Sequence, residues 1–358
     1  MLSQLTISTL RNIEQCSLAF KNGINLFVGS NGSGKTSVLE AIYLLALGRS
    51  FRTRTLKNII QFGHDQLLVA ARTTGATPVG LRYNAKDGLH IRLNSAPLKK
   101  LSDLAVELPT QYISANCHQF FELGPKFRRQ QLDWGLFHVE PRFNSLWQSY
   151  KKIIKQRNSA LKKKLGKQEI TLWDEQLVQY ASHIDRYRQR YLNNVFEKFK
   201  VLFTHLCPAF SDADFSLRYL KGWPKESELR TVLVENFERD LQLSYTRNGI
   251  HAADWSIRIN GANPIELLSR GQQKLFFIAL CIAQAELITE FKQQQSMFVI
   301  DDISSELDIS HQLNVINLLR KSKMQCFITT TNVELADALD SENETVFHVE
   351  HGTVSPKA

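Results

Sequence analysis

The residues of this chain that are best suited to chemistry form a glycine-rich bend near its N-terminus. Residues 29–36 match the pattern G-x-x-x-x-G-K-[ST]. The glycines let backbone N–H groups turn inward as an anion-binding nest, because a Cβ there would crowd the ligand. The bend predicts a nucleoside triphosphate site. Its expected contacts are Gly29, Ser30, Asn31, Gly32, Ser33, Gly34, Lys35 and Thr36.

Two side chains of the bend have specific predicted roles. Lys35 is a mobile positive charge that can reach the β- and γ-phosphates, and Thr36 offers a hydroxyl ligand for Mg²⁺. The bend must lie between a strand and a helix, and the pattern predicts a strand at Ile24–Val28 and a helix at Lys35–Leu47. The positive N-terminal end of that helix would face the phosphates.

A second pair of candidate residues follows an apolar stretch late in the chain. Met297–Ile300 predicts a buried parallel strand, which delivers Asp301 and Asp302 to the ligand edge of a sheet. We expect Asp301 to join the Mg²⁺ shell and Asp302 to be the catalytic carboxylate that polarises the attacking water. A strand followed by an ordinary polar turn is the alternative when this stretch is taken alone.

A third candidate segment, residues 268–274, precedes a helical pattern at Leu275–Leu287. Ser269 is a natural N-cap, and the exposed helix start with its hydroxyl suits a γ-phosphate. One nucleotide does not need two such helix starts. We therefore expect this one to face the nucleotide of a second copy of the chain. The residues predicted to make that contact are Ser269, Arg270, Gly271 and Gln272.

The rest of the chain predicts an α/β fold that is interrupted by helices. Strand patterns occupy the first 28 residues and residues 66–95, and strands alternate with helices from Met297 onward, which implies a parallel sheet. Between Lys126 and Leu206 the patterns are helical and highly charged, and a further helix is expected at Glu226–Leu241. We expect one split domain, 1–112 with 262–358, and a mainly helical insertion at 113–261.

Composition limits the class of protein and its partners. The 358 residues are 43% hydrophobic and carry a net charge of +9, which favours an acidic partner such as nucleic acid. The five cysteines form no CxxC pair, which indicates reduced thiols. We expect a cytoplasmic protein without a signal peptide and without a membrane-spanning segment.

Basic residues of the predicted insertion are candidates for DNA contacts. Such contacts need only cations at suitable spacing, and they would be salt-dependent and blind to sequence. A solvated helical face is the alternative for any one of these residues, but we favour DNA for the set. The candidates are Lys151, Lys152, Arg157, Lys162, Lys163, Lys164, Arg128 and Arg129.

The combined motifs resemble the ABC-type ATPase superfamily and its SMC and Rad50 branch, and they resemble the RecF family of bacterial recombination mediators most closely. Beyond the phosphate loop, the resemblance rests on five stretches spread along nearly the whole chain. They are LEAIYLLALGRSFRT at 39–53, GPKFRRQQLDWGLFH at 124–138, NFERD at 236–240, LSRGQQK at 268–274 and IDDISSELD at 300–308.

The resemblance implies a Rad50-like ATPase head, with a mixed sheet that has a parallel core, split by the helical insertion. It further implies ATP and Mg²⁺ as cofactors and a head-to-tail dimer that forms around two nucleotides. The family binds single- and double-stranded DNA and gapped junctions, and acts with RecR and RecO to load RecA. Its ATPase is slow and stimulated by DNA. A DNA clamp that uses ATP only to dimerise remains the alternative.

Three local departures from the family pattern affect individual residues. Ile113–Asn116 replaces a segment that usually carries Pro and then Glu, so Asn116 or Gln119 would have to substitute there. Ile250 stands where the family tends to have Pro. No histidine follows Cys326–Ile328, and any γ-phosphate sensor would therefore be a hydroxyl of Thr329–Thr331.

Other ATPase classes fit the spacing less well. An ABC transporter ATPase would place Ser269 closer to the phosphate loop, whereas here well over half of the chain separates them. An SMC or Rad50 arm would fill that gap with hundreds of heptad residues. A small-molecule kinase could share the loop, but it has no use for Ser269–Gln272.

Overall fold

The computed structural model describes residues 1–339 and 342–357, which form two compact units. The first unit contains Met1–Cys117 and Lys274–Ala358, and the second contains His118–Gln273. The sequence predicts domain boundaries at 112/113 and 261/262. These boundaries remain a prediction. Among the described residues, no helix combines the length and apolar character needed to cross a lipid bilayer.

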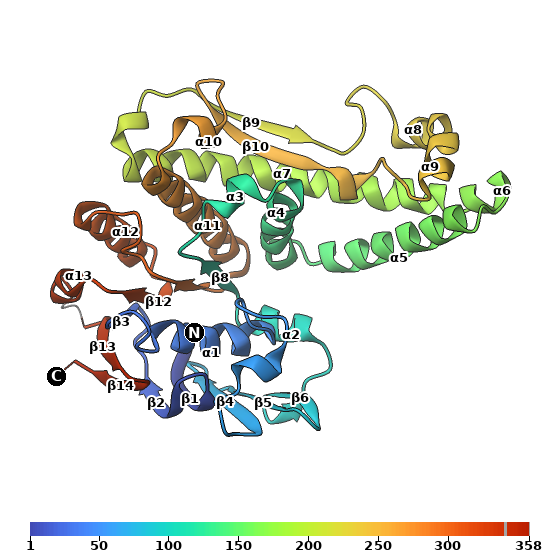
Figure 1. Cartoon of the computed structure of the whole chain (residues 1–358). Coiled ribbons are helices and arrows are strands. Elements are labelled where there is room, and N and C mark those ends of the chain that lie inside the picture. Colours follow the sequence, from blue (N-terminus) through green and yellow to red (C-terminus); the bar gives the residue numbers. More distant parts are fainter. Residues whose placement is uncertain (340–341, 358) are drawn as a thin grey trace. The chain divides into compact units, whose positions relative to one another are not determined.

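The first unit contains two sheets of six strands each (Figure 1). The antiparallel sheet has the order β2-β1-β4-β5-β6-β7. Its strands are β1 (Leu2–Leu10), β2 (Ile13–Ala19), β4 (Gln66–Thr73), β5 (Pro78–Asn84), β6 (Gly88–Leu93) and β7 (Ala96–Pro97). The mixed sheet has the order β14-β13-β3-β12-β11-β8. Its strands are β3 (Ile24–Val28), β8 (Thr110–Ile113), β11 (Met297–Ile300), β12 (Gln325–Thr330), β13 (Thr345–Glu350) and β14 (Thr353–Pro356).

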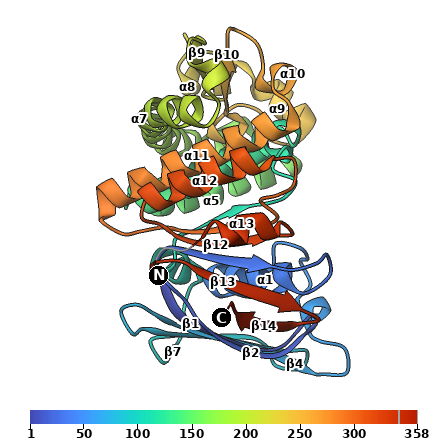
Figure 2. The same ribbon diagram turned by 90° about the vertical axis from the view of Figure 1, so that its left-hand side faces the viewer.

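Helix α1 (Lys35–Leu47) lies between the two sheets and is buried on nearly every side. Its apolar residues pack into one core with inward-facing residues of β1, β4 and β5 and with Val299 and Phe327 of the mixed sheet. Figure 2 shows the antiparallel sheet as a curved layer beneath this helix. A helix that is apolar all round is expected in such a buried position. The phosphate loop is therefore anchored to a rigid core element.

The remaining helices of the first unit are mostly on the other face of the mixed sheet (Figures 1 and 2). They are α11 (Arg270–Lys292, of which Lys274 onward belongs to this unit), α12 (Ile309–Lys321) and α13 (Val333–Asp337), and the short elements η1 (Leu56–Ile59) and α2 (Leu101–Glu107) complete the unit. Strands β13, β3, β12, β11 and β8 run parallel to one another, and the edge strand β14 is antiparallel to β13. The predicted α/β fold with a parallel core is confirmed.

The second unit is mainly helical and contains one antiparallel pair, β9 with β10. Its longer helices are α4 (Pro125–Val139), α5 (Phe143–Lys162) and α7 (Asp174–Leu206). Its short elements are α3 (Gln119–Glu122), α6 (Lys167–Thr171), η2 (Pro208–Phe210), β9 (Phe215–Leu220), α8 (Leu229–Glu235), α9 (Phe237–Leu243), η3 (Ile250–Ala252), β10 (Asp254–Ile259) and α10 (Pro264–Leu267).

One local expectation for the second unit was wrong, and two strands were missed. The helix expected at Glu226–Leu241 is two helices, α8 and α9, because the chain leaves helical geometry at Asn236, whose side chain donates a hydrogen bond to the Val232 carbonyl oxygen. The strands β9 and β10 were not predicted, although Trp255, Ile257 and Ile259 of β10 alternate with more exposed residues.

Candidate nucleotide site

The phosphate loop joins the end of β3 to the start of α1, as the sequence predicts. Gly32 and Gly34 have φ angles of 79° and 120°, which glycine adopts readily and other residues rarely adopt. A Cβ on Gly29 would lie 2.2 Å from the Val349 carbonyl oxygen. The Asn12 side chain also fixes the loop, since its amide donates to the Ser33 carbonyl oxygen at 3.1 Å. The loop conformation therefore depends on glycine at these positions.

The Lys35 side chain is folded over this loop. Its ammonium group donates to the carbonyl oxygens of Gly29 and Ser30, both at 2.8 Å. Burial lowers the pKa of Lys35, and the negative charges of Asp302 and Asp301 oppose that effect. Because phosphates are stronger acceptors than these carbonyl oxygens, the ammonium group can exchange partners when a nucleotide binds.

Thr36 and Asp301 come together from opposite ends of the chain. The Thr36 hydroxyl donates to the Asp301 carboxylate at 2.9 Å, and the Thr329 hydroxyl donates to the same carboxylate oxygen at 3.0 Å. The register explains this meeting: β3 and β11 both pair with β12, so their carboxyl ends lie at one edge of the sheet. A hydroxyl next to a carboxylate fits Mg²⁺, which takes one or two protein oxygens plus substrate phosphates.

Asp302 begins a tight turn and has a left-handed φ of 51°. Its backbone N–H donates to the Thr329 hydroxyl at 2.7 Å. Its carboxylate accepts hydrogen bonds from the Ser304 hydroxyl at 2.6 Å and from the Ser305 N–H at 3.2 Å. The turn thus fixes the direction of the carboxylate. Thr329 lies between the two aspartates, at the position where the sequence predicts a hydroxyl sensor.

A cavity of about 530 Å³ collects these groups within the first unit. Its lining includes the loop residues Asn31, Gly32, Gly34, Lys35 and Thr36 together with Asp301, Asp302 and Thr329. Arg11 and Asn12 also line it and were not predicted. Arg11 is held by the buried Glu40 at 2.9 and 3.0 Å. In the sequence, Arg11 and Asn12 appear only as a polar turn between β1 and β2.

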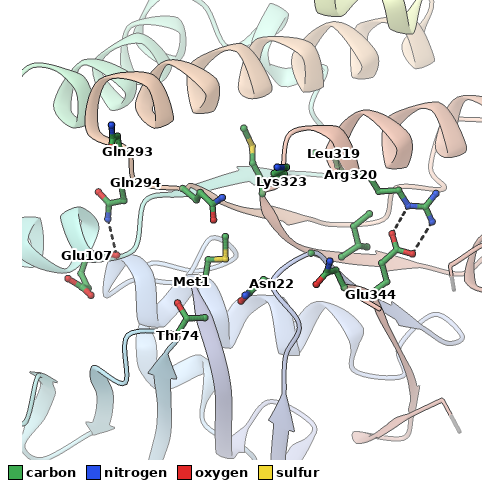
Figure 3. Close-up of a pocket in the computed structure, with 15 residues that line it drawn as sticks. Met1, Asn22, Thr74, Glu107, Gln293, Gln294, Leu319, Arg320, Lys323 and Glu344 are labelled. Atoms are coloured by element: carbon green, nitrogen blue, oxygen red, sulfur yellow. Dashed lines mark hydrogen bonds and ion pairs between the residues drawn. The ribbon is translucent and has the colours of Figure 1, made fainter. Parts of the chain in front are cut away.

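The same unit has a larger cavity, of about 840 Å³, which Figure 3 shows. It opens near the amino ends of β3, β11 and β12, among Met1, Glu107, Gln294 and the Arg320–Glu344 ion pair. Parallel sheets of this kind bind ligands at the carboxyl ends of their strands. The smaller cavity lies at the carboxyl ends of the strands and is therefore the candidate nucleotide site.

The helix start predicted to face a second nucleotide belongs to the second unit. The Ser269 hydroxyl accepts a hydrogen bond from the Gln272 N–H at 3.3 Å, and the Gln272 side chain accepts one from the Ser269 N–H at 3.0 Å. These reciprocal bonds form a capping box. Ser269 and Arg270 are exposed, so the helix start is accessible to another molecule. The role of Ser269–Gln272 opposite a nucleotide remains a prediction.

Asn116 and Gln119 are the two residues predicted to substitute for the family's glutamate. Both side chains are exposed, and the Asn116 N–H donates to the Ser114 hydroxyl at 3.2 Å. The neighbouring Ala115 lines the nucleotide cavity, whereas Gln119 begins α3 in the second unit. Their contribution to hydrolysis stays a prediction.

The prediction that Arg157 contacts DNA is wrong. Its side chain is fully buried and donates to Asp174 at 2.7 Å, to Asp240 at 2.8 Å and to Thr246 at 2.6 Å. This guanidinium group joins α5, α7 and α9. A buried cation paired in this way has a structural role, because removing one partner leaves an uncompensated charge.

Arg128 and Arg129 are bonded within the second unit, and their contact with DNA stays a prediction. Both are half-buried, and Arg128 makes two 2.9 Å hydrogen bonds to the Asp254 carboxylate. Arg129 donates to the Ala253 carbonyl oxygen at 2.6 Å. These bonds attach α4 to the start of β10. In contrast, five lysines of the set are exposed on α5 or just after it: Lys151, Lys152, Lys162, Lys163 and Lys164.

Comparison with known proteins agrees with the fold and the site. Residues 1–355 match the RecF/RecN/SMC N-terminal domain family. The chain is 39% identical to the DNA replication and repair protein RecF of Aliivibrio salmonicida over 360 residues, and 39% identical to that of Vibrio cholerae over 364 residues, with 99% of both chains covered in each case.

Solved structures extend this agreement to three dimensions. A structure described as the recombination mediator protein RecF-ATP in the RecFOR pathway matches with a TM-score of 0.85 and 25% identity, covering 100% of this chain and 97% of that chain. An SMC head bound to the C-terminal winged-helix domain of ScpA matches with a TM-score of 0.61 and 17% identity, and thus shows the fold alone. The chain belongs to the RecF family of DNA replication and repair proteins within the SMC-related ATPases.

Proposed function

We propose that this chain is an ATP-dependent DNA-binding protein of recombinational repair and replication maintenance. It binds gapped and single-strand–double-strand DNA as an ATP-induced dimer, and it promotes RecA loading together with RecO and RecR. Its slow, DNA-stimulated ATPase acts as a switch. The observation that carries the proposal is the meeting of Lys35, Thr36, Asp301 and Asp302 in one cavity of a RecF-family chain.

We infer a separate role in ATP binding or hydrolysis for each group of residues in the cavity. The loop N–H groups and Lys35 would hold the triphosphate, and Thr36 with Asp301 would hold Mg²⁺, which neutralises charge that develops on the phosphates. Asp302 would orient and polarise the attacking water. Thr329, which contacts both aspartates, would sense the γ-phosphate. Ser269–Gln272 of a second copy would close the site from the other side.

The five exposed lysines named above are the surface that we propose for DNA. They carry no acidic neighbour between Lys151 and Lys167 in the sequence, and the Lys162, Lys163 and Lys164 side chains extend from the end of α5. Contacts of this type attract any DNA through its phosphates. Binding through these lysines would therefore not depend on the DNA sequence.

Charge reversal at the end of α5 tests the function. The triple variant Lys162→Glu, Lys163→Glu, Lys164→Glu should bind gapped DNA at least tenfold more weakly at low salt. Because about three phosphate contacts are lost, the slope of log K against log salt should become shallower by about 2 to 3. Its basal ATPase should match the wild-type rate, while the stimulation by gapped DNA should fall.

The matched control reverses Lys86, Lys99 and Lys100, three exposed lysines of the first unit. This control has the same change of net charge and should keep most of the affinity. An unchanged salt slope in the Lys162–Lys164 variant would place DNA elsewhere on the chain. If gapped DNA did not raise the ATPase rate of the wild-type chain, the proposal that the ATPase acts as a DNA-stimulated switch would be wrong.

A further inference from the structure

Lys274 is a buried lysine that the proposed mechanism does not use. Its exposed fraction is 0%, and its ammonium group donates to the carbonyl oxygens of Asp302 and Ser305, both at 2.7 Å. Ser269 caps the helix that carries it. Both acceptors belong to the turn that begins with the catalytic candidate Asp302.

A charge in this position is costly. Burial lowers the pKa of Lys274, and the nearby Cys117 and the carboxylates Asp302, Glu306 and Asp301 only partly oppose that effect. An apolar side chain of similar length would avoid this cost. The ammonium group must therefore supply something that packing alone does not.

The backbone of the turn indicates that the ammonium group stabilises an unusual conformation. Asp302 has a φ of 51°, and Glu306, the residue directly after the turn, has a φ of 65°; both lie in the left-handed region that non-glycine residues seldom occupy. Such conformations cost on the order of 1–3 kcal/mol and persist only where surrounding contacts determine them. Lys274 joins the first and fourth residues of this turn, and Thr329 and Ser304 bind Asp302 from other sides.

We propose that Lys274 is a positioning residue that holds the 302–305 turn so that the Asp302 carboxylate faces the nucleotide cavity. This inference rests on the proposed function, because it assigns Lys274 to the same hydrolytic site. The residue does not touch the nucleotide and acts through the backbone of Asp302.

The test uses the full chain with Lys274→Met, which keeps the length of the side chain and removes its charge. We expect a single-turnover hydrolysis rate at least tenfold below wild type, an unchanged Kd for ATP and a Tm that falls only slightly, because two carbonyl oxygens of the turn lose their donor. Lys274→Arg, which keeps donors, should recover part of the rate. The control Lys292→Met removes a charge from the last residue of the same helix and should hydrolyse ATP normally.

A second measurement reads the turn without any nucleotide. Hydrogen exchange of the peptide that contains residues 301–306 should be at least tenfold faster in Lys274→Met than in the wild type and in Lys292→Met. This readout stands even if the wild-type chain proves not to hydrolyse ATP, and thus separates this inference from the proposed function. Unchanged exchange, or a wild-type hydrolysis rate in Lys274→Met, overturns the proposal. A parallel fall in Tm and ATP affinity also overturns it, since that indicates a purely structural residue.

Discussion

Lys35→Ala should lose nucleotide binding almost completely. The ammonium group is buried in the loop, where its bonds to β- and γ-phosphate oxygens would replace those it makes to Gly29 and Ser30. Charge-assisted hydrogen bonds contribute about 1.5–3 kcal/mol each, so losing two of them costs about 3–6 kcal/mol, or about 10²–10⁴-fold in Kd. Isothermal titration with a slowly hydrolysed ATP analogue measures this directly.

Two further variants show whether the effect belongs to the phosphate site. Lys35→Met keeps the buried stem and should bind as weakly as Lys35→Ala, with a Tm close to wild type. Lys21→Ala removes an exposed lysine from the turn before β3 and should bind normally. If Lys35→Ala retained wild-type affinity, the loop would not be the nucleotide site.

Asp302→Asn should bind ATP normally and hydrolyse it slowly. Asparagine tolerates the left-handed φ of this position, and its side-chain oxygen can still accept the hydrogen bond from Ser304. The turn is thus kept while the charge that polarises the water is lost. Because general acid–base catalysis contributes about 10²–10⁴-fold, we expect a single-turnover rate lower by at least 10².

The same variant separates a timed switch from a passive clamp. A switch that resets by hydrolysis should stay dimeric longer on ATP when Asp302 is replaced. A clamp that uses ATP only to dimerise should show no difference in dimer lifetime. Equal hydrolysis rates in wild type and Asp302→Asn would mean that Asp302 is not the catalytic carboxylate.

The residues of the first unit that line the candidate nucleotide cavity could be predicted because their signals are local. The glycines of the loop, Lys35 and Thr36 occupy eight consecutive positions, and Asp301 and Asp302 directly follow an apolar strand. The rule that parallel strands share a ligand edge then brings these two segments together. The 2.9 Å bond from Thr36 to Asp301 is the geometric result of that rule.

Contacts between distant residues could not be predicted in the same way. Arg157 stands in a basic run that looks solvated, and only the fold places Asp174 and Asp240 around it. Lys274 reads as an ordinary polar residue of a helix start, since its two acceptors are backbone carbonyl oxygens of another segment. Backbone acceptors have no sequence signature.

The central claim is that two copies of the chain enclose ATP between the loop of one and the Ser269 helix start of the other. Analytical ultracentrifugation of wild type, Ser269→Ala and Ser269→Thr, each with and without ATP and Mg²⁺, tests it most directly. Loss of the cap alone costs only about 1 kcal/mol, so Ser269→Ala should remain folded and bind ATP as a monomer. We predict ATP-induced dimers for wild type and Ser269→Thr and none for Ser269→Ala. An ATP-induced dimer of Ser269→Ala, or a wild-type chain that stays monomeric with ATP, would contradict the account.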